Sequence, residues 1–212
     1  MKILIVAGMP IDEITGSYDV VIGVDAGNLH LLHFGIRPDL AVGDFDSVSA
    51  DDFLKIKNQS RKLLKLPEKK DDTDLEIALN QAFEISDDAK VTIIGALGGR
   101  MDHMLSNLYL PTTSTYRAHA RQIQLVNAQN VIRYYPCGTY TLKRLEGMKY
   151  IGFVQVDTGE SLEITGAKYP LKAADNFKTI YTSNEFLTDT MTISHKKGML
   201  IVIYTKDEIP KK

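Results

Sequence analysis

Aspartates follow four apolar segments in the first half of the sequence. They are Asp25 after residues 20–24, Asp44 and Asp46 after residues 40–42, Asp71, Asp72 and Asp74 after residues 62–66, and Asp102 after residues 91–94. Carboxylates gathered at one place repel one another and hold protons unless a cation lies among them. Oxygen ligands without a cluster of cysteines or histidines suit Mg²⁺, which binds a few protein carboxylates together with substrate phosphates. The acids therefore indicate a magnesium site for a phosphate-bearing substrate.

A glycine-rich loop follows the last of these segments, with the sequence GALGGR at residues 95–100. Glycines between a strand and a helix let backbone N–H groups approach an anion, and the dipole of the following helix favours negative charge there. Arg100 adds a planar guanidinium that suits phosphate oxygens. The loop has neither the Gly-Lys-Ser/Thr ending of a Walker A loop nor the G-x-G-x-x-G pattern. A plain glycine turn is the alternative, and the arginine at its end favours phosphate binding.

Each acid also has a purely structural interpretation. The acids of residues 71–74 flank a predicted helix start, where negative charge is favourable because of the helix dipole. Those of residues 44–46 suit a turn held by side-chain hydrogen bonds, although their place after a strand favours function. Asp25 and Asp102 suit N-caps of the helices that follow them. The residue types alone leave these alternatives open.

The elements that must position these residues alternate between strands and helices. Strands are predicted at residues 2–7, 20–24, 40–42, 62–66 and 91–94. Two helices are predicted to begin at capping boxes, Ser49 with Asp52 and Thr73 with Glu76. This order predicts a parallel sheet with helices on both faces. Ligands of such sheets bind beyond the carboxyl ends of the strands, so we expect the acids and the glycine loop to face one cleft.

The second half of the sequence has a different pattern. Short strands are predicted at residues 131–135, 140–142, 150–156, 162–164, 190–195 and 199–205. Residues 196–198, Lys-Lys-Gly, look like a tight hairpin turn between the last two. These features predict an all-β second domain, with residues 1–125 in the first domain and 126–212 in the second.

Composition excludes several classes of protein. The 212 residues carry 25 Lys and Arg and 27 Asp and Glu, a net charge of −2, which argues against bulk binding of nucleic acid or of an anionic membrane surface. The single cysteine, Cys137, excludes a disulfide framework and a cysteine-rich zinc site. No membrane span or signal peptide is recognised in the sequence, so a cytoplasmic protein is expected.

Several motifs together resemble those of the thiamin pyrophosphokinase family. They are GVDAGNLHLLHFGIRPDLAVGDFDS, KKDDTDLEIAL, GALGGRMDHMLSN and, near the C-terminus, TSNEF and ISHKKGMLIVI. The resemblance implies transfer of the pyrophosphoryl group of ATP to the thiamin hydroxyl, giving thiamin diphosphate and AMP. It also implies an α/β chain with an N-terminal Rossmann-like parallel-sheet domain that binds the nucleotide, followed by a C-terminal all-β sandwich that binds thiamin. A homodimer with active sites between subunits is the implied assembly.

The resemblance also assigns roles to individual residues. The implied Mg²⁺ ligands are Asp44, Asp46 and Asp74. The implied catalytic and polyphosphate shell adds Asp71, Arg100 and Asp102. The implied ATP contacts are Asp25, Gly27, Gly98, Gly99 and Arg100. The implied thiamin contacts are Ser183, Asn184 and Ser194.

Two other functions remain open on the sequence. A DxD-type glycosyl- or nucleotidyltransferase would use Asp44 and Asp46 with Mg²⁺ to hold a nucleotide sugar, but it leaves the acids of residues 71–74 and the glycine loop unexplained. A non-catalytic nucleotide-sensing module would bind ATP without turnover. Incubation with ATP and thiamin, followed by detection of AMP and thiamin diphosphate, separates the three.

Overall fold

The chain folds into two compact units. The computed structural model describes residues 1–67, 69–159 and 161–207. Its contacts define an N-terminal unit, Met1–Leu110 with Leu125–Ala128, and a C-terminal unit, Pro111–Gln124 with Gln129–Lys212. Residues 111–124, which the predicted division after residue 125 gives to the first domain, group with the C-terminal unit by these contacts.

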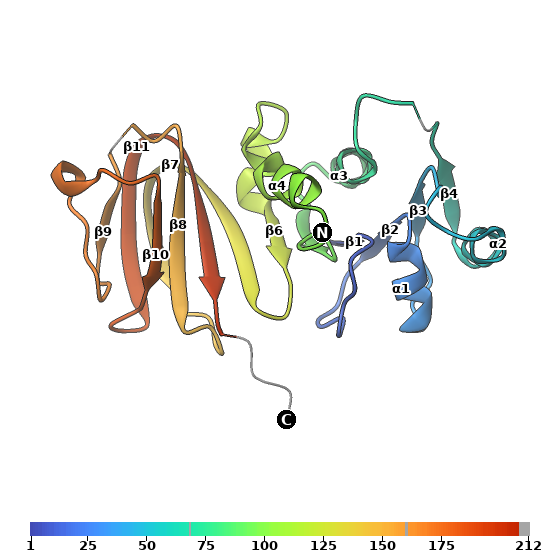
Figure 1. Ribbon diagram of the computed structural model, residues 1–212, viewed down its shortest axis with the longest axis horizontal. Coiled ribbons are helices and arrows are strands. Elements are labelled where there is room, and N and C mark those ends of the chain that lie inside the picture. Colours follow the sequence, from blue (N-terminus) through green and yellow to red (C-terminus); the bar gives the residue numbers. More distant parts are fainter. Residues whose placement is uncertain (68, 160, 208–212) are drawn as a thin grey trace. The chain divides into compact units, whose positions relative to one another are not determined.

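A parallel sheet with the strand order β5-β1-β2-β3-β4 forms the centre of the N-terminal unit (Figure 1). Its strands are β1 (Lys2–Val6), β2 (Val20–Val24), β3 (Leu40–Gly43), β4 (Lys62–Lys65) and β5 (Lys90–Ile94). The side chains of residues 3–6 in β1 are fully buried, as expected of a parallel strand covered on both faces. The chain runs outward from β1 to β4 and returns on the other side of β1 as β5. Ligands of such sheets bind beyond the strand ends where the order reverses.

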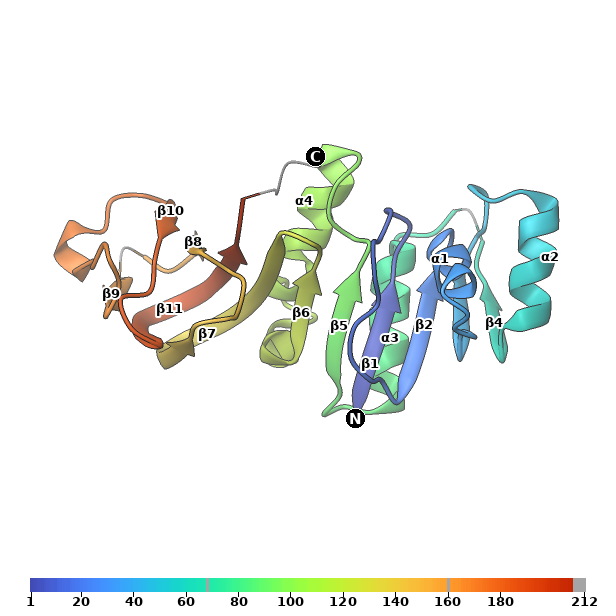
Figure 2. The same cartoon turned by 90° about the horizontal axis from the view of Figure 1, so that it is seen from below.

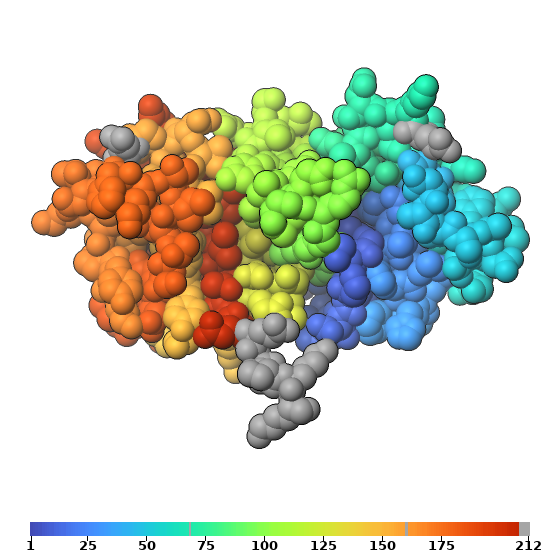
Figure 3. Space-filling model, in the orientation of Figure 1, coloured from blue at the N-terminus to red at the C-terminus, as the bar shows by residue number. Residues whose placement is uncertain are grey.

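Helices cover both faces of this sheet, which confirms the predicted layering. They are α1 (Gly27–His33), α2 (Ala50–Gln59), α3 (Asp74–Ile85) and α4 (Met101–Tyr109). Figure 2 shows α1 in front of the strands and α3 behind them. On the α1 face, Leu31 packs in one cluster with Leu4 and Val6 of β1. All nine residues of α4 are described and none is buried, and the helix lies at the surface in Figure 3, where it is green.

Local sequence signals determine where these helices begin and end. The predicted capping box at α3 is confirmed, because Thr73 accepts a hydrogen bond from the Glu76 N–H and Glu76 accepts one from the Thr73 N–H. At α2, the Ser49 side chain accepts from the Asp52 N–H. Helix α1 ends at His33, and the φ of 70° at Gly35 just beyond it allows backbone hydrogen bonds back to the carbonyls of the last turn.

The C-terminal unit consists mainly of antiparallel strands in the order β10-β8-β11-β7, and β9 pairs with the first half of β11. These strands are β7 (Asn130–Lys143), β8 (Tyr150–Val156), β9 (Glu163–Thr165), β10 (Ile180–Asn184) and β11 (Thr190–Thr205). The short β6 (Ile123–Val126) precedes them, and the 3-10 turns are η1 (Leu110–Thr112), η2 (Arg117–Gln122) and η3 (Ala173–Asp175). Buried side chains such as Phe153, Ile193 and Tyr204 form its core.

The structure corrects the strand boundaries predicted for this unit. The predicted strands at 131–135 and 140–142 are one strand, β7, and those at 190–195 and 199–205 are one strand, β11. The predicted tight hairpin at residues 196–198 is wrong. His195 pairs with Gly138 and Met199 with Pro136, so these three residues form a bulge opposite Cys137. In the sequence, Gly198 resembles a turn residue. In the structure it lies in the bulge of one continuous strand. Strand β10 was not predicted.

Among the described residues, no helix is long and apolar enough to cross a membrane.

Candidate active site

Three aspartates meet at the carboxyl end of the parallel sheet. One carboxylate oxygen from each of Asp25, Asp44 and Asp74 lies within 4.8 Å of the others. Asp25 follows β2, Asp44 follows β3, and Asp74 is the first residue of α3. Among the described residues this group contains Asp25 rather than Asp46, which the family resemblance had implied as the third metal ligand.

Backbone geometry fixes the position of Asp25. Its φ is 44°, and its side-chain Oδ1 accepts a hydrogen bond of 3.2 Å from the Phe45 N–H. A Cβ at Gly43 would lie 1.9 Å from the same Oδ1, so a side chain there would displace the carboxylate. The N-cap of α1 is Ala26, without a side-chain cap. The alternative that Asp25 caps this helix is therefore wrong, and its carboxylate faces the other acids.

Burial and neighbouring charge make Asp25 hard to ionise. Burial raises the pKa of the Asp25 carboxyl to about 7, with further raising contributions from Asp74, Asp44 and Asp46. The hydrogen bond from the Phe45 N–H opposes this shift. Since an ordinary aspartate ionises near pH 4, this pKa indicates a place where a positive charge is needed.

A lysine already lies between two of the acids. The Lys70 Nζ is 2.9 Å from Asp44 Oδ2 and 3.2 Å from Asp74 Oδ1. The hydrogen bond from Lys70 is the largest of the causes that lower the pKa of Asp44. The sequence analysis missed Lys70. The available signal was its place four residues before Asp74, within the acidic segment at the start of α3.

The acids and the glycine loop line one cleft of about 690 Å³. The residues of interest in its lining are Asp25, Asp44, Asp46, Lys70, Asp71, Asp72, Asp74, Gly98 and Arg100. Asp46 also donates its N–H to Asp44 Oδ1 at 3.2 Å. The structure thus brings together most of the residues singled out in the N-terminal half.

Three predicted residues lie at the border of this cleft or outside its lining. Asp102 forms an exposed ion pair of 2.6 Å with Arg100, and its hydrogen bond from Arg100 lowers the Asp102 pKa to about 2. It does not cap α4, whose N-cap is Arg100 without a side-chain cap. Gly27 packs on the backbone of β1, since a Cβ there would lie 2.0 Å from the Val6 oxygen. A Cβ at Gly99 would lie 2.7 Å from the Met9 sulfur, so this glycine packs closely against Met9.

The predicted thiamin residues occupy three different environments in the C-terminal unit. Ser183 lines a cavity of about 490 Å³ together with Tyr150, Tyr169 and Glu185. Asn184 is buried, and its amide bonds the backbone N–H and carbonyl of Tyr169 at 3.0 and 2.8 Å. The Ser194 Oγ lies 3.0 Å from the Thr139 Oγ1 on the neighbouring strand. Only Ser183 among them lines this cavity.

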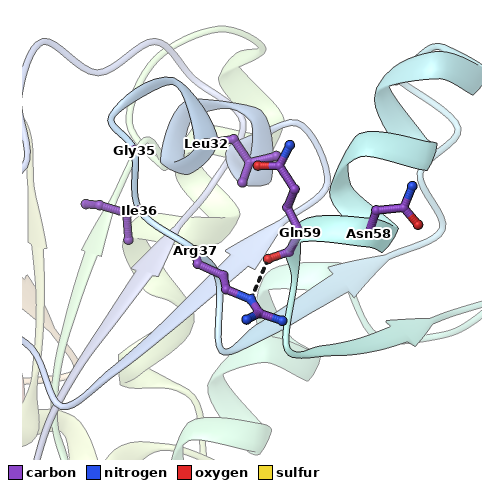
Figure 4. Close-up of a pocket in the computed structure, with 6 residues that line it drawn as sticks. All are labelled: Leu32, Gly35, Ile36, Arg37, Asn58 and Gln59. Atoms are coloured by element: carbon purple, nitrogen blue, oxygen red, sulfur yellow. Dashed lines mark hydrogen bonds between the residues drawn. The ribbon is translucent and has the colours of Figure 1, made fainter.

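A third cavity, of about 350 Å³, lies between the ends of α1 and α2 (Figure 4). It is lined by Leu32, Gly35, Ile36, Arg37, Asn58 and Gln59. The Arg37 Nε donates to the Gln59 carbonyl at 2.9 Å, which ties the segment after α1 to the end of α2. These six residues, all in the described part of the chain, include no carboxylate, so the cavity lacks the features of the acidic cleft.

Comparison with known proteins identifies the family of the chain. Residues 11–125 match the thiamin pyrophosphokinase catalytic domain, and residues 139–200 match the thiamin pyrophosphokinase vitamin B1 binding domain. Thiamine pyrophosphokinase of Bacillus subtilis (strain 168) is 37% identical over 214 residues, which cover 96% of this chain and 98% of that protein.

Solved structures agree with this match. A thiamin pyrophosphokinase family protein from Enterococcus faecalis is 37% identical, with a TM-score of 0.91 over 98% of this chain and 100% of that chain. Thiamin pyrophosphokinase from Geobacillus thermodenitrificans is 32% identical, with a TM-score of 0.82 over 98% and 99% of the two chains. The acidic cleft lies at the sheet edge where the sequence predicts it. The chain belongs to the thiamin pyrophosphokinase family, because both domain models match it and a relative aligns with it along nearly its whole length.

Proposed function

We propose that the chain transfers the pyrophosphoryl group of ATP to the hydroxyl of thiamin in a Mg²⁺-dependent reaction, giving thiamin diphosphate and AMP. The observation that carries this proposal is the cleft in which three close aspartates face a glycine loop ending in an arginine. Family membership supports the choice of substrates. A cytoplasmic location is part of the same proposal, because ATP is the co-substrate.

The residues present fit a magnesium ion. Asp25, Asp44 and Asp74 offer oxygens that converge, and the ammonium of Lys70 lies against two of them in the position of a cation. When bound, the ion neutralises the charge of the polyphosphate so that the thiamin hydroxyl can approach it. Asp46 lines the same cleft and is proposed as a further ligand of the ion, as the resemblance implies, and Asp71, which also lines the cleft, is proposed to position the phosphates.

The glycine loop is proposed to hold the polyphosphate. Gly98 and Arg100 line the cleft, and α4 begins directly after them, so its N-terminal N–H groups favour an anion at the same place. Asp102 is proposed to orient Arg100 through their ion pair rather than to touch the substrate.

Replacing Arg100 with lysine is expected to lower kcat/KM for ATP by about tenfold or more, because lysine keeps the charge but loses the planar fork that bonds two phosphate oxygens. Steady-state kinetics with ATP varied would measure the loss. The Arg100 side chain is 70% exposed, so the melting temperature should not change. A matched control is Arg117→Lys in the C-terminal unit, which should keep full activity. Unchanged kinetics in Arg100→Lys would mean that the loop does not bind phosphate through this side chain.

The C-terminal unit is proposed to be the β-sandwich that binds thiamin. Its cavity of about 490 Å³ has the size of a small-molecule site, and Ser183 lines it beside Tyr150, Tyr169 and Glu185. Aromatic rings and a carboxylate suit the positively charged thiazolium ring of thiamin. The chain has no tryptophan, so tyrosine is the aromatic residue available here for stacking. Asn184 is proposed to support this cavity by holding the backbone of Tyr169, and a role for Ser194 stays a prediction.

A homodimer is the proposed assembly. Large apolar side chains of the C-terminal unit are exposed, with Phe177 78%, Leu187 65% and Tyr169 58% accessible. The segment that contains them is orange in Figure 3. Light scattering at micromolar concentration is expected to give twice the chain mass of 23.7 kDa, about 47 kDa. An active monomer at this concentration would remove the proposal of sites shared between subunits.

Incubation with Mg²⁺, ATP and thiamin tests the function directly. The expected products are AMP and thiamin diphosphate in equal amounts. Release of ADP would indicate a different phosphoryl transfer, and ATP binding without turnover would support the nucleotide-sensing alternative. The DxD-transferase alternative accounts for Asp44 and Asp46 only, whereas the cluster includes Asp25 and Asp74 from two other elements.

A further inference from the structure

The ammonium of Lys70 lies against one carboxylate oxygen of Asp44 and one of Asp74, two members of the acidic cluster formed by Asp25, Asp44 and Asp74. Asp44 Oδ1 accepts the N–H of Asp46, and Asp44 Oδ2 accepts the hydrogen bond from Lys70 at 2.9 Å. Asp74 Oδ1, which lies 3.2 Å from the same ammonium, is shielded from solvent. The side chains of Lys70, Asp44 and Asp74 are only 13%, 13% and 18% exposed, so water screens these contacts weakly.

A divalent ion and this ammonium compete for the same oxygens. Mg²⁺ contacts carboxylate oxygens at about 2.1 Å, and a cation of charge +2 at that distance would lie next to the ammonium in a partly buried site. The two positive charges repel each other strongly there. An ion bound at these two oxygens would therefore favour departure of the ammonium from Asp44 and Asp74.

Lys70 has a second anionic partner available when it leaves. It lines the same cleft as Gly98 and Arg100, where the polyphosphate of ATP is proposed to lie. Its four-carbon stem is flexible, and its only other hydrogen bond in the structure, among the described residues, goes to the Pro67 carbonyl at 3.2 Å. A rotation of this side chain would move the charge from the carboxylates to the phosphates without a change in the backbone.

We propose that Lys70 is an exchangeable counter-ion, which holds Asp44 and Asp74 together in the metal-free protein, is displaced by the divalent ion and then contacts the polyphosphate of ATP. The inference rests on the proposed magnesium site. It adds that the binding of metal and the binding of nucleotide are coupled through one lysine, because the metal displaces the ammonium that the polyphosphate of ATP then binds.

Metal titration of Lys70→Met without nucleotide tests the first step. Methionine keeps an apolar chain of similar length and removes the charge. Since the loss of a hydrogen bond to a charged group shifts a binding equilibrium by about tenfold or more, we expect Mn²⁺, used as a spectroscopic substitute for Mg²⁺, to bind the variant at least tenfold more tightly than the unaltered protein. Free Mn²⁺ is measured by electron paramagnetic resonance. Lys69→Met is the matched control, because Lys69 is exposed and adjacent in sequence, and its Mn²⁺ affinity should not change.

Kinetics test the second step. Lys70→Met is expected to raise KM for ATP about tenfold or more, whereas Lys69→Met should not, and thermal melting in the presence of Mn²⁺ shows whether both variants are folded. Lys70→Gln, a polar and neutral replacement, takes the place of Lys70→Met if methionine disturbs folding. It should change the metal affinity in the same direction.

Three results would contradict the inference, and they are distinguishable. Equal or weaker Mn²⁺ binding in both Lys70 variants would mean that the lysine does not compete with the ion. Tighter Mn²⁺ binding with an unchanged KM for ATP would remove the contact with the polyphosphate. Absence of Mn²⁺ binding in the unaltered protein, with and without ATP, would overturn the magnesium site itself and the counter-ion with it.

Discussion

Replacing Asp44 with asparagine is expected to reduce turnover by about three orders of magnitude or more. Asparagine keeps the shape of the side chain but removes the negative charge that faces Asp25, Asp74 and the proposed Mg²⁺. Loss of metal-assisted charge stabilisation of several kcal/mol corresponds to a rate loss of this size. The measurement is AMP formation at saturating ATP and thiamin, with Mg²⁺ varied.

The melting temperature should change much less than the activity, because Asp74 remains as a partner for Lys70 and removal of the Asp44 charge relieves its repulsion with Asp25. Asp51→Asn is the matched control, since Asp51 is exposed in the first turn of α2 and outside the cleft lining. Excess EDTA should abolish activity in the unaltered protein and in Asp51→Asn. Full turnover in Asp44→Asn, or in EDTA, would remove the metal assignment.

Replacing Asp25 with asparagine is expected to stabilise the metal-free protein at alkaline pH while removing most of its activity. The folded-state pKa of Asp25, about 7, lies above its unfolded value of 3.8. Between these two pKa values the folded state binds the proton and the unfolded state does not. The free energy of unfolding therefore falls as the pH rises from about 4 to 7. Above pH 7 the ionised carboxylate is expected to destabilise the fold by about 2–4 kcal/mol, and asparagine avoids this penalty.

Thermal melting in EDTA at pH 5 and at pH 8.5 measures the effect. Asparagine should raise the melting temperature less at pH 5, where only part of the penalty is present, than at pH 8.5, where Asp25 is ionised in both states. Asp44→Asn is an informative comparison, because the pKa of Asp44 is lowered by Lys70 and its removal should not stabilise the protein at alkaline pH. A difference between Asp25→Asn and the unaltered protein that is the same at both pH values would contradict the raised pKa.

Much of the N-terminal unit could be predicted from the sequence because its signals are local. Strands of a parallel sheet are buried on both faces, so β1 and β2 read as short apolar runs. The capping box of α3 is contained within four residues. The convergence of Asp25, Asp44 and Asp74 then follows from the rule that parallel strands end at one edge.

The role of Lys70 could not be predicted in the same way. Its ammonium contacts Asp44, 26 positions earlier in the chain, and a flexible side chain in a connecting segment gives no periodic signal. The resemblance implies an ATP contact for Asp25, whereas its left-handed backbone, which is not visible in the residue type, accompanies a carboxylate oxygen within 4.8 Å of those of Asp44 and Asp74.

The C-terminal unit was less predictable because two of its strands, β7 and β11, are long and their pairing is interrupted by a bulge. A glycine resembles a turn residue when only the neighbouring residues are considered, and Gly138 in β7 and Gly198 in β11 are glycines inside continuous strands. Whether a strand turns back or bulges depends on the partner strand. The pairing of His195 with Gly138 and of Met199 with Pro136 is a tertiary property.

Strand β11 makes the C-terminal unit a single cooperative block. It pairs with β7 on both sides of the bulge at residues 196–198, with β9 in its first half and with β8 in its second half. Neither half of the unit can open without breaking hydrogen bonds to a strand that the other half also needs. Amide hydrogens of β7, β8 and β11 should therefore exchange with solvent at one common rate, through global opening of the unit, and loss of β11 would separate β7 and β9 from β8 and β10, which line the proposed thiamin cavity.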